Sequence, residues 1–250
     1  MKKIIWITGA STGIGHALAL EMAARGYTVC ATARSADKLA ALSVHSDIHA
    51  YAGDVRNFDD MKTIVSAIEA AHGPIEIAVL NAAIYQLTNA IPFEREKYIA
   101  QIETNQIGVI NGLAALLPRM EEHKRGAVWV VGSVAGFGGL PTAAAYASTK
   151  AALINMVQSL KFDLDKRGIH IGIINPGFVD TPLVSGNRFK MPFIMPPEKA
   201  AKIIADGMAK RKFEITFPRR FSWMIKFGSN LPYALYFPII KMVSKWSGRE

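Results

Sequence analysis

Six short apolar runs, separated by segments with helical periodicity, are the feature that most limits what this chain can fold into. The runs are KIIWIT, TVCATA, IHAYAG, IEIAVLN, GAVWVVGS and IHIGIINP, starting at residues 3, 28, 48, 75, 126 and 169. Short, continuously apolar runs are typical of strands that are buried on both faces, and helices between them are typical of parallel crossovers. The chain is therefore predicted to have an α/β fold with a doubly wound parallel β-sheet.

Length and composition favour one domain built on this sheet. With 250 residues and 50% hydrophobic content, the chain can bury one large core, so residues 1–250 are predicted to form a single three-layer α/β/α domain of the Rossmann type. Gly26 and Gly168 each follow a helical segment with basic residues in its last turn, as helix-ending glycines do. In such open sheets, ligands bind beyond the carboxyl ends of the strands.

The cysteine content and the N-terminus favour the cytoplasm. Cys30 is the single cysteine and lies in a run predicted to be a buried strand, so no disulfide framework is expected. The apolar stretch near the N-terminus is too short for a signal peptide, and no apolar run approaches the roughly 20 residues that span a bilayer. The histidines have no spacing typical of a metal site, so none is predicted.

The positive charge is concentrated in a basic, aromatic C-terminal tail, residues 210–250. This tail has nine Lys/Arg, two Asp/Glu and nine of the 23 aromatic residues of a chain whose net charge is +9. Two short helices interrupted at the sequence GSNLP are expected within it. Residues 217–246 would suit peripheral contact with a membrane surface, a contact within a homo-oligomer, or a cover over the active-site mouth. No nucleic-acid-binding motif accompanies the charge, so no such partner is predicted.

The first predicted strand runs into the glycine-rich sequence TGASTGIG, which is followed at once by a helix. Glycines there permit a tight turn and a close backbone approach, and the helix N-terminus offers free N–H groups to a pyrophosphate. This context predicts a dinucleotide site. The residues expected to hold the cofactor at this turn are Gly9, Ser11, Thr12, Gly13, Ile14 and Gly15.

The end of the second strand indicates which dinucleotide is bound. An acidic residue there would bond the 2′-hydroxyl of the adenosine ribose, whereas an arginine would accept a 2′-phosphate. The strand ends with Ala33 and Arg34, so NADP(H) is predicted rather than NAD(H). The alternative for Arg34 is a solvated surface side chain.

Taken in order, these motifs resemble the short-chain dehydrogenase/reductase family. The resemblance rests on TGASTGIG, Asp54-Val55, the NAA sequence at 81–83, Asn105, Ser133, YASTK at 146–150 and NPGFVDT at 175–181. It implies that Asp54 and Val55 contact the adenine and that Asn81 stabilises the central strand beside the cofactor. Ala82 and Ala83 would line the cofactor, although Ala83 stands where the family usually has glycine. The nicotinamide end would be held by Pro176, Gly177, Val179 and Thr181.

The same resemblance implies a catalytic set of Asn105, Ser133, Tyr146 and Lys150. Tyr146 and Lys150 share one face of a helix at i and i+4. Tyr146 would exchange the proton, and a lysine charge about 5 Å away would favour the phenolate by roughly 3 kcal/mol, lowering the phenol pKa. Lys150 would also bond the nicotinamide ribose, Ser133 would donate to the substrate oxygen, and Asn105 would hold a water of a proton relay. Without the resemblance, Ser133 would be interpreted as a helix cap or turn serine.

Residues 180–200 are expected to form a substrate lid, because Leu183, Phe189, Met191, Phe193, Ile194 and Met195 make this segment apolar. The alternative is that these side chains only pack the loop onto the body. The sequence thus predicts an NADP(H)-dependent carbonyl reductase or alcohol dehydrogenase that acts on a lipophilic carbonyl or secondary alcohol, in a homodimer or homotetramer. The competing hypothesis is a non-catalytic NADP(H)-binding redox sensor whose tail engages a membrane or partner.

Overall fold

The computed structural model describes residues 2–186 and 191–243, and in these ranges it has a seven-stranded, all-parallel sheet. The strands are β1 Ile4–Thr8, β2 Thr28–Ala33, β3 Ile48–Ala52, β4 Ile77–Leu80, β5 Gly126–Val131, β6 Ile169–Pro176 and β7 Glu214–Phe217. Their order is β3-β2-β1-β4-β5-β6-β7. Ile5 of β1 pairs with Val29 of β2 on one side and Ile77 of β4 on the other, so the winding reverses between β1 and β4. The predicted Rossmann-like fold is confirmed.

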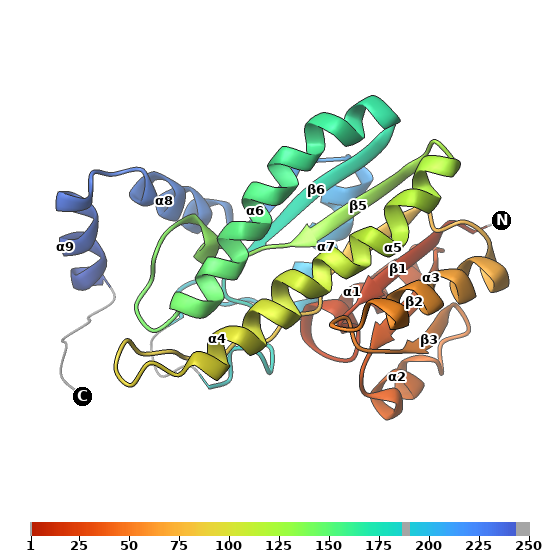
Figure 1. The fold of residues 1–250 in the computed structure, drawn as a ribbon, viewed down its shortest axis with the longest axis horizontal. Coiled ribbons are helices and arrows are strands. Elements are labelled where there is room, and N and C mark those ends of the chain that lie inside the picture. Colours follow the sequence, from red (N-terminus) through yellow and green to blue (C-terminus); the bar gives the residue numbers. More distant parts are fainter. Residues whose placement is uncertain (1, 187–190, 244–250) are drawn as a thin grey trace.

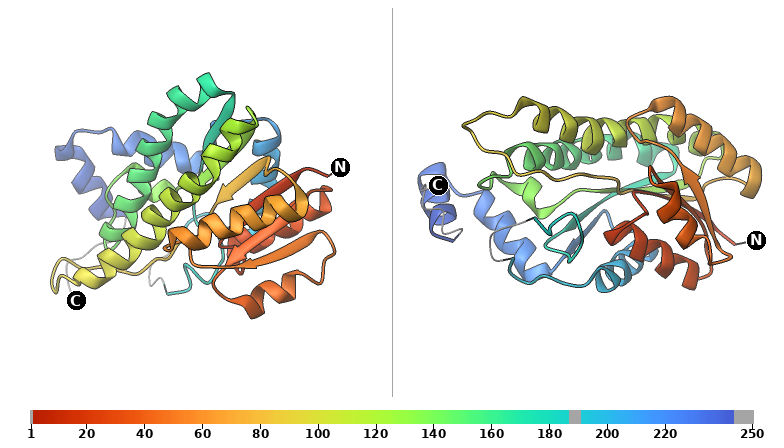
Figure 2. Two further views of the ribbon diagram at one scale, coloured as in Figure 1. Left: turned by 45° about the vertical axis from the view of Figure 1, so that its right-hand side comes forward. Right: turned by 90° about the horizontal axis from the view of Figure 1, so that it is seen from below.

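Helices cover both faces of the sheet (Figures 1 and 2). The α-helices are α1 Gly13–Ala24, α2 Ala36–Leu42, α3 Phe58–His72, α4 Arg95–Ile102, α5 Gly108–Glu122, α6 Ala144–Leu164, α7 Pro197–Ala209, α8 Arg219–Ser229 and α9 Tyr233–Val243. A π-helical turn, η1 Glu103–Ile107, joins α4 to α5, and short 3-10 turns lie at η2 Val134–Phe137 and η3 Asp165–Arg167.

The strand pleat divides the core into two halves. Ile5 and Ile7 face a cluster with α1 and α7, whereas Ile4 and Trp6 face a cluster with α3, α5 and α6. All five β1 residues are buried, which is why the strand is apolar without alternation. Because parallel strands end on the same side, β1, β4, β5 and β6 direct their following loops to one edge, where the predicted site residues lie.

The sequence did not predict a strand within the tail, but residues 214–217 form β7 and belong to the sheet. β7 pairs in parallel with β6, and Phe217 is fully buried in the core. The two expected helices follow as α8 and α9, and they are separated at 230–232 as the GSNLP sequence predicts. Residues 244–246 of the proposed contact segment lie outside the described residues.

Candidate active site

The glycine-rich turn between β1 and α1 has a geometry that strongly favours glycine. Gly9 and Gly13 have φ angles of +67° and +59°, in the left-handed region. A Cβ on Gly9 would lie 2.7 Å from Ala82 Cα, and one on Gly15 would lie 2.3 Å from the Gly9 carbonyl oxygen. The turn is therefore pressed against the end of β4, leaving a cradle of bare backbone at the carboxyl edge.

Asn81 locks this turn in place. Its side-chain amide donates to the carbonyl oxygens of Thr8 and Gly9, at 3.0 and 3.2 Å. The Thr8 hydroxyl accepts in return from the backbone N–H groups of Asn81 and Ala82. Asn81 thus connects the ends of β1 and β4 at the point where the winding reverses.

The N-terminus of α1 fits a pyrophosphate. The N-cap residue Thr12 makes no side-chain capping bond, so the first N–H groups of the helix are not satisfied by that hydroxyl. A Cβ on Gly13 would lie 3.0 Å from Thr181 Cγ2, so the turn faces the loop that follows β6. Helix dipole, free N–H groups and bare glycine backbone together suit a phosphate-containing cofactor.

Two arginines interact with Asp54, which follows β3. Arg34 is exposed directly after β2, and it contributes to lowering the pKa of Asp54. The larger cause of that lowering is Arg56, whose Nη2 donates to Asp54 Oδ2 at 2.6 Å. Arg56 was not predicted from the sequence, although its position two residues after Asp54 is a signal that could have found it. Val55, between Asp54 and Arg56 in the sequence, is buried, and its carbonyl oxygen accepts a hydrogen bond from the Asn111 side-chain amide.

Ser133, Tyr146 and Lys150 come together where β5 ends and α6 begins. Ser133 follows β5 and Tyr146 lies in the first turn of α6, where Ser133 lowers the phenol pKa. Ser133 Oγ also accepts from the Ala135 N–H at 3.1 Å, so this serine caps η2 as well. The Tyr85 ring lies edge-on to the Tyr146 ring, with centroids 4.9 Å apart, and forms a neighbouring wall that sequence reasoning missed.

The electrostatics of Tyr146 differ from the sequence-based expectation. Burial is the largest influence and raises the phenol pKa to about 12, whereas the expectation was that Lys150 would lower it. The Lys150 ammonium lies 5.5 Å from the Tyr146 ring centroid and donates to the Val131 carbonyl oxygen at 2.7 Å. Burial also lowers the pKa of Lys150 to about 7, because this nearly inaccessible ammonium has lost its water shell. Near neutral pH the phenol therefore holds its proton while the lysine is close to giving one up.

Asn105 lies in the π-helical turn η1 and is fully buried. Its side chain accepts from the Ile84 N–H at 2.8 Å, donates to the Ile84 carbonyl at 3.0 Å and donates to Thr149 Oγ1 at 3.2 Å. It therefore ties the loop after β4 to α6, next to Lys150. The wider turn of a π-helix directs this amide inward, which a purely α-helical pattern did not predict.

The remaining predicted residues lie along the same edge. Ala82 and Ala83 follow β4, Ser11 and Ile14 lie in the glycine-rich segment, and Pro176 ends β6. The Gly177 N–H donates to Phe217, and Val179 forms an isolated bridge with Met195. Met195 is buried in the core, so this side chain packs its loop onto the body.

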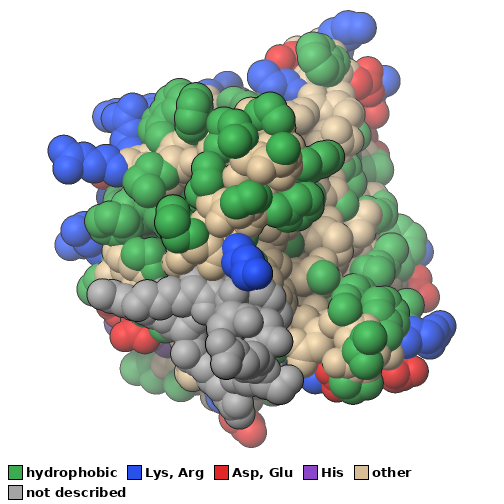
Figure 3. Space-filling view, turned by 90° about the vertical axis from the view of Figure 1, so that its left-hand side faces the viewer, with side chains coloured by type: hydrophobic (Ala, Val, Ile, Leu, Met, Phe, Trp, Pro, Cys, Tyr) green, Lys and Arg blue, Asp and Glu red, His purple; other side chains and the backbone are tan. Residues whose placement is uncertain are grey.

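The rest of the predicted lid is divided between loop and helix. Residues 197–200 belong to α7, while Phe193 and Ile194 are exposed, and Phe189 lies outside the described residues. Figure 3 shows hydrophobic side chains gathered over this end of the molecule. Phe193 and Phe178 both approach Phe221 of α8, with ring centroids 6.0 and 5.8 Å apart. The tail therefore contributes to the wall beside the predicted lid.

The sequence profile described as short chain dehydrogenase matches residues 3–191, which include the cradle and the Ser133, Tyr146 and Lys150 cluster. The chain belongs to the short-chain dehydrogenase family. This short-chain dehydrogenase is 36% identical over 237 residues to an uncharacterised oxidoreductase of Myxococcus xanthus, covering 92% of the chain and 93% of that protein. It is 32% identical over 186 residues to the 3-oxoacyl-[acyl-carrier-protein] reductase FabG of Thermotoga maritima, covering 72% and 76%.

Solved structures of similar fold hold nicotinamide dinucleotides of both kinds. An alcohol dehydrogenase of Thermococcus sibiricus complexed with 5-hydroxy-NADP has a TM-score of 0.77 and 25% identity, covering 87% of this chain and 96% of that one. A short chain dehydrogenase/reductase of Burkholderia phymatum in complex with NAD has a TM-score of 0.83 and 19% identity, covering 90% and 92%.

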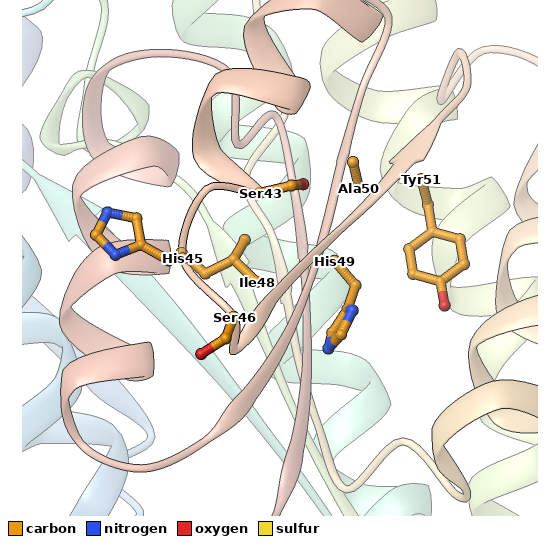
Figure 4. A pocket seen from close by; sticks show the side chains of 7 residues that line it. All are labelled: Ser43, His45, Ser46, Ile48, His49, Ala50 and Tyr51. Carbon is orange, nitrogen blue, oxygen red and sulfur yellow. The ribbon is translucent and has the colours of Figure 1, made fainter.

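A separate surface hollow of about 570 Å³ lies where α2 leads into β3 (Figure 4). It is lined by Ser43, His45, Ser46, Ile48, His49, Ala50 and Tyr51. Since the loop 43–47 precedes β3, the hollow lies toward the amino end of the sheet, away from the dehydrogenase site. In residues 2–186 and 191–243, no cluster of three His, Cys, Asp or Glu side chains could hold a metal ion.

Proposed function

We propose that this short-chain dehydrogenase uses NADPH to reduce a lipophilic ketone or aldehyde to an alcohol, with Tyr146 as the general acid. The observation that carries the proposal is the geometry of the site: the buried Tyr146 phenol lies beside Ser133 and Lys150, at the edge of the sheet where the glycine cradle also lies. Burial raises the pKa of this phenol, so it holds its proton at neutral pH and is in the form that a general acid for carbonyl reduction requires.

Each residue of the set has a part in this reaction. When bound in the glycine cradle, the dinucleotide would supply the hydride that reduces the carbonyl carbon. Tyr146 gives its proton to the carbonyl oxygen, and Ser133 donates a hydrogen bond to that oxygen as negative charge develops. Lys150, whose pKa of about 7 lets it hold or release a proton near neutrality, returns a proton to the phenolate. Asn105 positions the backbone around Lys150 through Thr149 and Ile84.

Arg34 supports NADPH as the preferred cofactor, because its exposed guanidinium lies at the end of β2 and could bind a 2′-phosphate in bidentate fashion. The nearby Asp54 carboxylate is hydrogen-bonded by Arg56, which partly offsets its attraction for Arg34. The substrate class is supported by the Tyr85 ring beside Tyr146 and by the relatives described as 3-oxoacyl-[acyl-carrier-protein] reductases.

We also propose that the protein is a homo-oligomer and that it is located in the cytoplasm. A homodimer or homotetramer rests on the family resemblance, and light scattering of the purified chain tests it. A cytoplasmic location rests on the single, buried Cys30. Among the helices that the structure describes, none combines the length and the apolar character needed to span a membrane.

The test of the reaction is Tyr146→Phe, assayed against a panel of ketones with NADPH. Loss of the proton donor is expected to lower kcat by about 10²- to 10⁴-fold while NADPH affinity, measured by fluorescence titration, changes little. Unchanged kcat would refute Tyr146 as the acid. Tight NADPH binding with no turnover of any carbonyl by the unaltered enzyme would instead favour the redox-sensor hypothesis.

Cofactor preference is tested separately by Arg34→Gln. Removing one charge-assisted phosphate contact is expected to reduce the ratio of kcat/KM for NADPH over NADH by about 10- to 100-fold. Lys38→Gln is the matched control, because Lys38 is an exposed cation on α2 just beyond the strand end. An equal ratio in the Arg34→Gln and Lys38→Gln enzymes would contradict the assignment to Arg34.

A further inference from the structure

Helix α9 is apolar on all sides and yet largely exposed. Its sequence YALYFPIIKMV has one charged residue, Lys241, and one buried residue, Tyr236. Tyr233, Phe237 and Met242 are 76%, 62% and 72% exposed. A helix that is hydrophobic all round is normally enclosed by protein or lipid, so water is not the expected environment of this surface.

Other elements extend this apolar surface. Trp223, Met224 and Phe227 of α8 are exposed, and so are Phe193 and Ile194 beside them. The loop before α4 adds Ile91 and Phe93 at the same end of the molecule, toward which β5 and β6 point (Figure 1). We call the exposed apolar residues of α8 and α9 the apolar face (Figure 3).

The charge on this segment indicates what covers it. Residues 219–243 include four basic residues and no acidic one, and Arg219, Arg220 and Lys241 are exposed. A two-fold contact between two copies through the same helices would bring these like charges together, which opposes association. An anionic surface with an apolar interior complements both the charge and the aromatic side chains.

We infer that the apolar face docks on an anionic lipid bilayer surface. Trp223, Phe227 and Tyr233 enter the interfacial region, and the arginines and Lys241 contact lipid phosphates. This is peripheral binding by two short helices that lie on the membrane. The partner is therefore a lipid surface, and a second copy of the chain is the outcome that the experiment must exclude.

The docking helices are bonded to the loop that leads from Ser133 to Tyr146. The Tyr236 hydroxyl donates to the Gly139 carbonyl oxygen at 2.6 Å. The Lys226 ammonium lies 4.9 Å from the centroid of the Phe137 ring. Docking would therefore bring the mouth of the candidate active site to the bilayer, and, on the basis of the proposed function, the substrate class is a carbonyl compound dissolved in lipid.

The test is flotation of the full chain with vesicles of phosphatidylcholine alone or with added phosphatidylglycerol. Binding is expected only with the anionic vesicles. The triple variant Phe227→Ser, Phe237→Ser, Met242→Ser should lose binding, and these side chains are exposed, so the fold should be retained. Charge reversal at Arg219, Arg220 and Lys241 to Glu should weaken it by at least 100-fold.

The matched control is Val44→Ser with Phe162→Ser. These two side chains are 85% and 78% exposed. Val44 follows α2 and Phe162 lies near the end of α6, so both are toward the amino edge of the sheet. This control should bind anionic vesicles like the unaltered chain. Equal flotation of all variants, or no flotation of the unaltered chain, would overturn the proposal. So would a dimer in light scattering that the serine variants dissociate without any vesicle binding.

Docking and catalysis are measured independently. The Tyr146→Phe chain should float like the unaltered chain, since Tyr146 is not on the apolar face. The serine variants should retain kcat for a short, water-soluble ketone and lose activity only toward a carbonyl held in vesicles. If the proposed reaction were wrong, flotation with vesicles would still be observed. If docking were wrong, turnover of the water-soluble ketone would still be observed.

Discussion

At the scale of single residues, burial dominates over charge in the candidate catalytic pair. The spacing of Tyr146 and Lys150 predicted that both lie on one helix face, and they do. The pKa shifts of the two groups could not be predicted in this way, because they depend on burial by elements that are distant in the sequence. Burial raises the pKa of the Tyr146 phenol and lowers the pKa of the Lys150 ammonium.

This arrangement predicts a pH-dependent stability that Lys150 controls. The pKa of Lys150 is about 7 in the folded protein, against 10.5 when unperturbed, so between these values the unfolded chain binds a proton that the folded one lacks. The free energy of unfolding should therefore rise with pH through this window. Lys150→Met should remove that rise, which thermal melts at pH 7 and pH 9 would detect.

The raised pKa values of Cys30 and Tyr146 do not disturb this comparison. Cys30 and Tyr146 have pKa values raised to about 12 from 9.0 and 10.0, so they lower stability only as the pH rises above those starting values. Lys38→Met, a change at an exposed lysine, is the control and should keep the rise. If the melting temperature changed equally between pH 7 and pH 9 in the unaltered and Lys150→Met proteins, the pKa of Lys150 would be the same in the folded and unfolded states.

At the scale of elements, the sequence predicted the strands and turns that are marked by a pattern of neighbouring residues. The six apolar runs became β1 to β6, and the glycine-rich turn lies between β1 and α1 as expected. β7 was missed because Glu214–Phe217 is four residues long and lies in a segment marked by charge and aromatic residues. The π-helical turn around Asn105 was missed because its inward amide is stabilised by Ile84 and Thr149, which are distant in the sequence.

The glycine cradle makes a prediction at this scale. Gly15→Ala places a methyl group 2.3 Å from the Gly9 carbonyl oxygen. Because this oxygen belongs to the backbone, it cannot move away as the end of a flexible side chain could. The variant should lose about 1–3 kcal/mol of stability, measured by denaturant unfolding, together with at least about 10-fold in NADPH affinity.

Gly228→Ala in α8 is the control for this change. Nothing lies within 4 Å of a Cβ at that position, and alanine favours a helix, so this variant should be unchanged or about 0.5–1 kcal/mol more stable. A Gly15→Ala protein with unaltered stability and NADPH affinity would mean that close backbone packing does not form the cofactor site.

At the scale of the whole molecule, the parallel sheet directs its chemistry and its apolar surface to the same end. The cradle, the Ser133 and Tyr146 cluster and α8 all follow strand carboxyl ends (Figure 2). The sequence predicted this convergence for the cofactor and catalytic residues, since topology alone places them there. It did not predict that Tyr236 and Lys226 of the tail contact the loop between Ser133 and Tyr146, because no pattern encodes such contacts.

The most direct measurement of the central claim follows the hydride itself. The enzyme is incubated with a lipophilic ketone and with NADPH that carries deuterium at both positions of nicotinamide C4, and the alcohol is analysed by mass spectrometry. The account predicts one deuterium on the carbinol carbon with the unaltered enzyme and almost no labelled product with Tyr146→Phe. Tight binding of NADPH without any labelled alcohol from a broad ketone panel would contradict it.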